Sequence, residues 1–154
     1  MADGETFNQE EHEMEVRKQL ISEIMSDQVT YVGPQATVAE AARLMRDKDF
    51  GALPIADDDR LVGMLTDRDI SIRVVADGKD PTTTTVREAM TPEVRYCFDD
   101  QTVEEIARNM GAQKVRRLPV MNRDKRLVGI VALGDLSKVA SPQTTAESLS
   151  EISR

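Results

Sequence analysis

The sequence of 154 residues carries a formal net charge of −8, and its length allows one compact domain or two small ones that share a core. The excess of acidic residues disfavours non-specific nucleic-acid binding, which needs a broad basic face. A single cysteine, Cys97, excludes an intrachain disulfide and fits a reducing compartment. No apolar stretch approaches the roughly 20 residues of a membrane span, and the acidic N-terminus does not resemble a signal peptide. We therefore expect a cytoplasmic protein with no membrane partner.

The chain begins with an acidic head, residues 1–15, which is predicted to be disordered. Apolar residues at helical spacing from Val16 to Ile24 then predict a leading helix that packs by one face. The segments that follow are expected at residues 29–32 (strand), 38–48 (helix), 53–56 (strand), 60–65 (strand) and 67–76 (helix). Thr37 and Glu40 form a capping box that fixes the start of the first of these helices.

A polar loop, residues 77–85, ends in another capping box, Thr85 and Glu88, which opens a short helix. The same order of elements then returns, at residues 94–97 (strand), 103–113 (helix), 118–121 (strand), 126–131 (strand) and from 134 (helix). We divide the chain into the head, a first repeat with its leading helix (16–80), a second repeat (81–140) and a flexible tail (141–154).

The duplication is visible in the sequence itself, because Leu61–Asp69 returns as Leu127–Asp135. The offset is 65 residues from Met25 to Met90 and 66 from Gly63 to Gly129, so the second copy holds one extra residue near Lys125 or Arg126. A nearly constant offset over most of the chain indicates a tandem of one structural unit.

The two copies predict an α/β fold with pseudo-two-fold symmetry, each copy being strand–helix–strand–strand–helix. The segments Leu61–Leu65 and Leu127–Val131 are apolar at almost every position. Such strands are usually covered on both faces, so we expect both to be central strands under helices.

These motifs resemble those of the cystathionine β-synthase (CBS) domain pair, and the resemblance covers residues 20–140. The segments that carry it are Met25-Ser26-Asp27 and Met90-Thr91-Pro92, Thr37-Val38 and Thr102-Val103, Leu53-Pro54-Ile55 and Leu118-Pro119-Val120, and Gly63 to Asp69 and Gly129 to Asp135. The chain is similar to small stand-alone CBS-pair proteins of prokaryotes. The resemblance implies a regulatory module rather than an enzyme, a homodimer, and an unidentified protein partner. It implies AMP, ADP or ATP as a regulatory ligand between the copies, ahead of NAD or S-adenosylmethionine, with no required cofactor.

The resemblance assigns the main ligand site to Thr66 and Asp69. A carboxylate at a helix start can accept both ribose hydroxyls, and the threonine hydroxyl beside the helix amides suits a phosphate. The cleft would be completed by residues of the other copy, Val115 against the adenine and the arginines toward the phosphates: Arg95, Val115, Arg116 and Arg117. Strand alternation lets only one of Arg116 and Arg117 face such a cleft.

The opposite cleft would join Asp135 to Thr30, Phe50 and Gly51. It has Ala132 where the first copy has a threonine and no basic residue, so we predict a weaker or empty second site.

Other readings stay open. Thr66 and Asp69 also form a capping box that could serve the helix alone, and the protein could be a ligand-free scaffold. The basic residues of the second copy could form a protein- or nucleic-acid-docking patch. His12 is the only histidine, and we expect neither catalytic residues nor a metal site. For Cys97 we expect a buried packing role.

Overall fold

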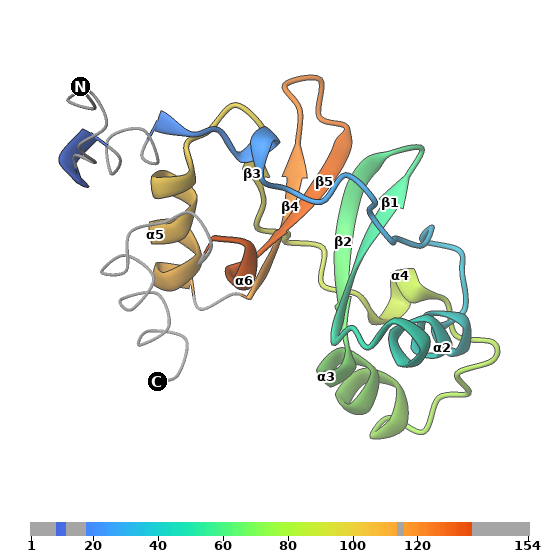
Figure 1. Ribbon diagram of the computed structural model, residues 1–154. Helices are drawn as coiled ribbons and strands as arrows, with labels where there is room; N and C mark the ends of the chain where they lie inside the picture. The colour runs from blue at the N-terminus through green and yellow to red at the C-terminus, as the bar shows by residue number, and fades with distance from the viewer. Residues whose placement is uncertain (1–8, 12–17, 114–115, 137–154) are drawn as a thin grey trace, which may run out of the picture. The chain divides into compact units, whose positions relative to one another are not determined.

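The computed structural model describes residues 9–11, 18–113 and 116–136 (Figure 1). The chain divides into two compact units. The first-repeat unit consists of residues 28–96 and 121–128. The second-repeat unit consists of the chain up to residue 27, residues 97–120 and the chain from residue 129. Residues 9–11 are helical, whereas the rest of the predicted head and the predicted tail lie outside the described residues.

The first-repeat unit is a two-stranded antiparallel sheet with helices packed on it (Figure 1). Its elements are α2 (Val38–Lys48), β1 (Ala52–Asp57), β2 (Arg60–Thr66), α3 (Asp67–Ile70), the π-helical turn η3 (Ser71–Val75) and α4 (Val86–Ala89). The expected helix over 67–76 is therefore present, as α3 continued by η3. Isolated bridges extend the sheet, with Val32 beside Ile55 on one side and Thr91 beside Met64 on the other.

Helix α2 shows how local sequence fixes an element. The Glu40 amide donates to Thr37 Oγ1 at 3.2 Å, and the Thr37 amide donates to Glu40 Oε2 at 3.1 Å, which confirms the predicted capping box. The helix ends at Asp49, whose left-handed backbone (φ 57°) terminates the turn.

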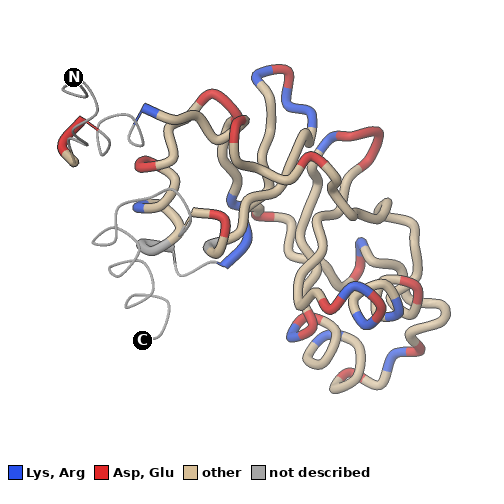
Figure 2. Tube along the Cα trace, in the orientation of Figure 1, with Lys and Arg blue, Asp and Glu red and all other residues tan. Residues whose placement is uncertain are grey.

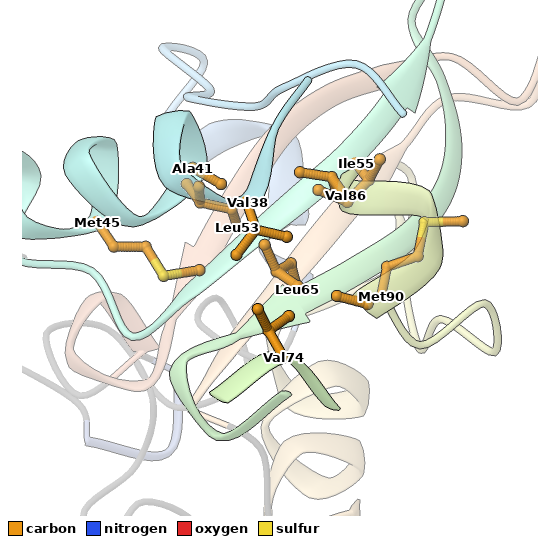
Figure 3. Close-up of a cluster of buried hydrophobic side chains, with 10 residues drawn as sticks. Val38, Ala41, Met45, Leu53, Ile55, Leu65, Val74, Val86 and Met90 are labelled. Carbon is orange, nitrogen blue, oxygen red and sulfur yellow. The ribbon is translucent and has the colours of Figure 1, made fainter. Parts of the chain in front are cut away.

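The core of the first-repeat unit lies between the sheet and these helices (Figure 3). Buried side chains from α2, both strands, η3 and α4 meet there, namely Val38, Ala41, Met45, Leu53, Ile55, Leu65, Val74, Val86, Ala89 and Met90. Because α2, both strands, η3 and α4 all contribute, none of these can be removed without exposing apolar surface.

Two strand predictions for this unit were wrong. Residues 29–32 do not form a strand, because only Val32 is bonded to the sheet, by its amide to Pro54 O (3.3 Å) and its carbonyl to the Ala56 amide (3.0 Å). Leu61–Leu65 is not covered on both faces: Leu61, Val62 and Met64 are half-buried, whereas Gly63 and Leu65 are buried. Leu53–Ala56 of β1 is buried at every position instead.

The second-repeat unit holds the three-stranded sheet β3–β4–β5. Its elements are η2 (Ile21–Glu23, a 3-10 turn), β3 (Cys97–Phe98), α5 (Val103–Gln113), β4 (Arg117–Met121), β5 (Leu127–Ala132) and α6 (Leu133–Leu136). The strand expected at 94–97 is thus only two residues long and lies later. A leading helix was expected from Val16 to Ile24. In the described part of that range, the named element is the short 3-10 turn η2. Residues 121–128, at the turn between β4 and β5, are grouped with the first-repeat unit.

The opening segment of each repeat, its first few bonded residues, packs in the unit that is built mainly from the other repeat. The segment around Ile21 bonds to the second repeat, with the Ile21 amide donating to Gln101 O (2.9 Å) and Ser26 bridging Ile130. The segment from Thr85 to Thr91 bonds to the first repeat, with bridges from Thr85 to Thr37 and from Thr91 to Met64. The division into units therefore differs from the order of the repeats along the chain.

Candidate functional site

The Thr66–Asp69 motif is a complete capping box at the start of α3. Thr66 Oγ1 accepts from the Asp69 amide at 3.0 Å, and Asp69 Oδ2 accepts from the Thr66 amide at 2.9 Å. Both residues are half-buried. One carboxylate oxygen is thus held by the backbone, and the motif places a carboxylate and a hydroxyl together at a helix start.

Gly51 lies beside this helix start because β1 and β2 are antiparallel. Ala52 is paired with Thr66, so the preceding Gly51 meets Asp67, whose amide donates to Gly51 O at 3.0 Å. A Cβ on Gly51 would stand 3.4 Å from Asp67 Oδ2. The sequence interpretation grouped Gly51 with Asp135, and did not identify this contact with the α3 start.

Thr91 is a second neighbour that the sequence did not reveal. Its Oγ1 lies 3.5 Å from Asp69 Oδ1, the oxygen opposite the one that Thr66 holds. Backbone bonds between Thr91 and Met64, of 2.8 and 2.9 Å, fix Thr91 beside β2. The repeated Met-Ser/Thr opening was visible in the sequence, but its position depends on the exchange of opening segments.

The matching position in the second-repeat unit is a half box. Asp135 Oδ2 accepts from the Ala132 amide at 3.0 Å, while the methyl side chain of Ala132 offers no oxygen to the helix. The two helix starts therefore differ in capping, while the inequality of the two ligand sites stays a prediction.

The other predicted site residues are distributed over both units. Arg95 is exposed in the first-repeat unit, whereas Arg116 is exposed and Arg117 half-buried in the second-repeat unit. Val115 lies outside the described residues. Thr30 and Phe50 are half-buried in the first-repeat unit, and Phe50 packs against its core.

The turn between β1 and β2 is acidic (Figure 2), and its side chains and backbone have partners. Tyr31 Oη donates to Asp59 Oδ1 at 3.0 Å, which, with the charge of Asp59, raises the pKa of Tyr31. Arg126 donates to the Asp58 carbonyl and lies 3.7 Å from its carboxylate. Asp58 and Asp59 both have positive φ, of 52° and 65°, so these contacts hold a tight turn. Over the described ranges, no three His, Cys, Asp or Glu residues are grouped so that they could hold a metal ion.

Comparison with known proteins decides the family. The model of the "CBS domain" matches residues 21–76 and again residues 86–142. The chain belongs to the CBS domain family. The sequence-based resemblance and the tandem α/β fold are thereby confirmed, and the chain is a CBS pair, a regulatory module. None of the helices in the described ranges is long and apolar enough to cross a membrane.

Two relatives match this CBS pair over most of their own length. Hypoxic response protein 1 of Mycobacterium tuberculosis is 45% identical over 117 residues, which is 75% of this chain and 81% of the relative. The CBS domain-containing protein YhcV of Bacillus subtilis is 39% identical over 134 residues, 86% of this chain and 94% of the relative.

Solved structures of CBS proteins include several with bound groups. Hypoxic Response Protein I, crystallised with two coordinated zinc ions, is 43% identical with a TM-score of 0.72, over 80% of this chain and 100% of that one. CBSX2 in complex with AMP is 26% identical with a TM-score of 0.68, over 78% and 94%. The CBS pair of MJ0100, in complex with 5′-methylthioadenosine and S-adenosyl-L-methionine, is 30% identical with a TM-score of 0.66, over 78% and 94%.

Proposed function

We propose that this CBS pair is a non-catalytic sensor of adenine nucleotides. AMP, ADP or ATP binds between the repeats, and the bound state differs from the free state in repeat or dimer arrangement, which a partner protein reads. The observation that carries the proposal is the complete Thr66–Asp69 box, where Asp69 presents a carboxylate and Thr66 a hydroxyl at a helix start. Relatives with AMP and with S-adenosylmethionine bound support the ligand class.

In the proposed main site, the Asp69 carboxylate accepts the ribose hydroxyls and Thr66 meets a phosphate. Opposite them we place the residues Arg95, Val115, Arg116 and Arg117, of which the arginines offset the phosphate charge. The second site, with Asp135, Ala132, Thr30, Phe50 and Gly51, is weaker because Ala132 offers no hydroxyl at the helix start.

Calorimetric titration of two matched variants tests this assignment. Asp69→Ala should weaken AMP or ATP binding by about 10- to 100-fold, since hydrogen bonds to a charged group contribute roughly 1.5–3 kcal/mol. Asp135→Ala, at the equivalent position, should change affinity by less than about twofold. Asp69→Asn keeps the side-chain shape and separates loss of the charge from loss of the cap.

The reverse ranking would move the nucleotide to the Asp135 helix start. In the repeat register Arg116 corresponds to Gly51, and Gly51 contacts the start of α3. Arg116 would then be the basic residue beside Asp135.

A melting-temperature series separates the sensor from a ligand-free scaffold. Millimolar AMP, ADP, ATP, NAD and S-adenosylmethionine are added in turn. A ligand at about 100 times its Kd stabilises by roughly 2.7 kcal/mol, or about 5–10 °C for a domain of this size. A flat response to all five would favour the scaffold, for which the search turns to protein partners.

The proposed homodimer has a candidate contact on η3. Ile72 and Val75 there are 48% and 70% exposed, and their counterparts in the repeat register are Lys138 and Ser141. Val75→Glu should convert the dimer to a monomer in light scattering if this face forms the contact. A dimer that persists in the variant would place its contact elsewhere.

A further inference from the structure

The carboxylate of Asp69 touches two different parts of the chain. Oδ2 accepts from the Thr66 amide at 2.9 Å, within its own helix start. Oδ1 lies 3.5 Å from the hydroxyl of Thr91. That separation is longer than the roughly 2.5–3.0 Å of an ordinary O–H···O hydrogen bond, so the contact is weak and easily replaced.

Thr91 ends the opening segment of the second repeat, residues 85–91, which we call simply the opening segment. The CBS match of the second repeat starts at residue 86, yet this segment is packed in the first-repeat unit. The Asp69–Thr91 contact therefore joins the proposed ribose-binding carboxylate of one repeat to the first residues of the next.

The opening segment is held to the first-repeat unit at further points. Thr91 and Met64 exchange two backbone hydrogen bonds, and Met90 lies over Gly63 of β2. Arg73 of η3 donates from Nη1 to Met90 O at 2.9 Å and to Ala89 O at 3.4 Å. The helical stretch formed by α3 and η3 thus contacts the opening segment through two of its side chains, Asp69 and Arg73.

We propose that nucleotide binding is passed to the second repeat through the Asp69–Thr91 contact. This inference rests on the proposed function. A ribose hydroxyl that donates to Asp69 Oδ1 takes the place of the Thr91 hydroxyl, because the 3.5 Å contact of Thr91 is the weaker of the two. The opening segment then loses its contact with Asp69, while its hydrogen bonds to Arg73 remain. The ligand shifts a local equilibrium of the segment by its differential interaction with the gripped and released states.

Hydrogen exchange of peptides spanning residues 86–95 tests the relay, with AMP as the probe and calorimetry as the independent measure of binding. In the wild type, saturating AMP should speed exchange there by about twofold, because the long Asp69–Thr91 contact contributes less than an ordinary hydrogen bond. Thr91→Val should show the faster exchange without AMP and no further change with it. Thr91→Ser, which keeps the hydroxyl, should behave as the wild type.

Matched controls identify the contact rather than general loosening. Ser26→Ala, at the equivalent position of the other opening segment, should leave exchange at 86–95 unchanged with and without AMP. Thr91→Val should still bind AMP within about fivefold of the wild type, since loss of a weak coupling changes affinity little.

Each failure has a separate meaning. If the wild type binds AMP but Thr91→Val retains slow exchange, or responds to AMP in full, the relay is wrong and the sensor proposal stands. If Thr91→Val no longer binds AMP, Thr91 contacts the ligand directly and the relay is equally overturned. If the wild type binds no adenine nucleotide in calorimetry, the proposed function and the relay fall together.

Discussion

Gly63 and Gly129 lie where another segment of the chain comes close to a sheet strand. A Cβ on Gly63 would stand 2.5 Å from Met90 Sδ and 3.0 Å from Thr91 O. On Gly129 it would clash with Met25 Sδ and stand 3.0 Å from Ser26 O. The flexible methionine can move, but the carbonyl belongs to a hydrogen-bonded bridge. Glycine is therefore required here by space.

Gly63→Ala should lower the free energy of unfolding by about 1–3 kcal/mol, the usual cost of overpacking. Gly33→Ala is the control, because its Cβ would meet Ala56 O at an ordinary 3.9 Å, and it should change stability by less than about 0.5 kcal/mol. Urea unfolding measures both. Equal effects would contradict the steric argument.

Cys97 is the second residue whose surroundings fix its chemistry. It is 2% exposed, its Sγ lies 3.8 Å from Pro119 O, and burial, followed by the charge of Asp99, raises its pKa to about 12. Because the pKa of the thiol in the folded protein lies above its usual 9.0, the thiol stays protonated at neutral pH. Its contribution to stability is present below about pH 9 and is lost as the pH rises toward about 12.

We expect Cys97 to be unreactive toward a thiol reagent in the folded protein at about pH 8. Reaction should follow global unfolding in denaturant, at the rate of an unstructured thiol. Rapid labelling of the native protein would show that the strand around Cys97 opens locally.

At the scale of elements, helix starts were predictable and short strands were not. The boxes at Thr37 and Thr66 depend on residues three apart, so the sequence contains all that is needed. A strand at 29–32 needed a partner along its length, and β1 supplies one only at Val32. The site shows the same limit, because Asp69 was identified from its motif whereas Thr91 and Gly51 approach it only through strand pairing.

Ala132→Thr should complete the half box at the start of α6. The new hydroxyl would cap the helix as Thr66 caps α3, and the free energy of unfolding should rise by about 0.5–2 kcal/mol. Thr66→Ala should lower it by a similar amount. Urea unfolding measures both changes. A destabilising Ala132→Thr would mean that the α6 start has no room for the hydroxyl.

At the scale of the whole molecule, the sequence predicted the duplication but not the exchange of opening segments. The offset between copies is the same whether a segment packs on its own repeat or on the other, so periodicity cannot distinguish the two. Ile21 and Val86 illustrate this, being equivalent in sequence, both fully buried, and each in the unit built mainly from the other repeat.

Cavity-forming variants at these two positions should act crosswise. Ile21→Ala should cost about 2–5 kcal/mol and speed hydrogen exchange in α5 and β5. Val86→Ala should instead speed exchange in α2, β1 and β2, while α5 is spared. If each variant speeds hydrogen exchange only in its own repeat, the proposed swap of opening segments between the repeats is contradicted.

The exchanged opening segments also bear on how such a chain could have arisen. A polypeptide with a single repeat would have an opening segment whose binding strand lies on another molecule. Two molecules would have to swap opening segments to fold, as in a domain-swapped dimer. Gene duplication and fusion would then turn that intermolecular swap into a swap between two repeats of a single chain. On this view, a covalent link replaced what had been a concentration-dependent association.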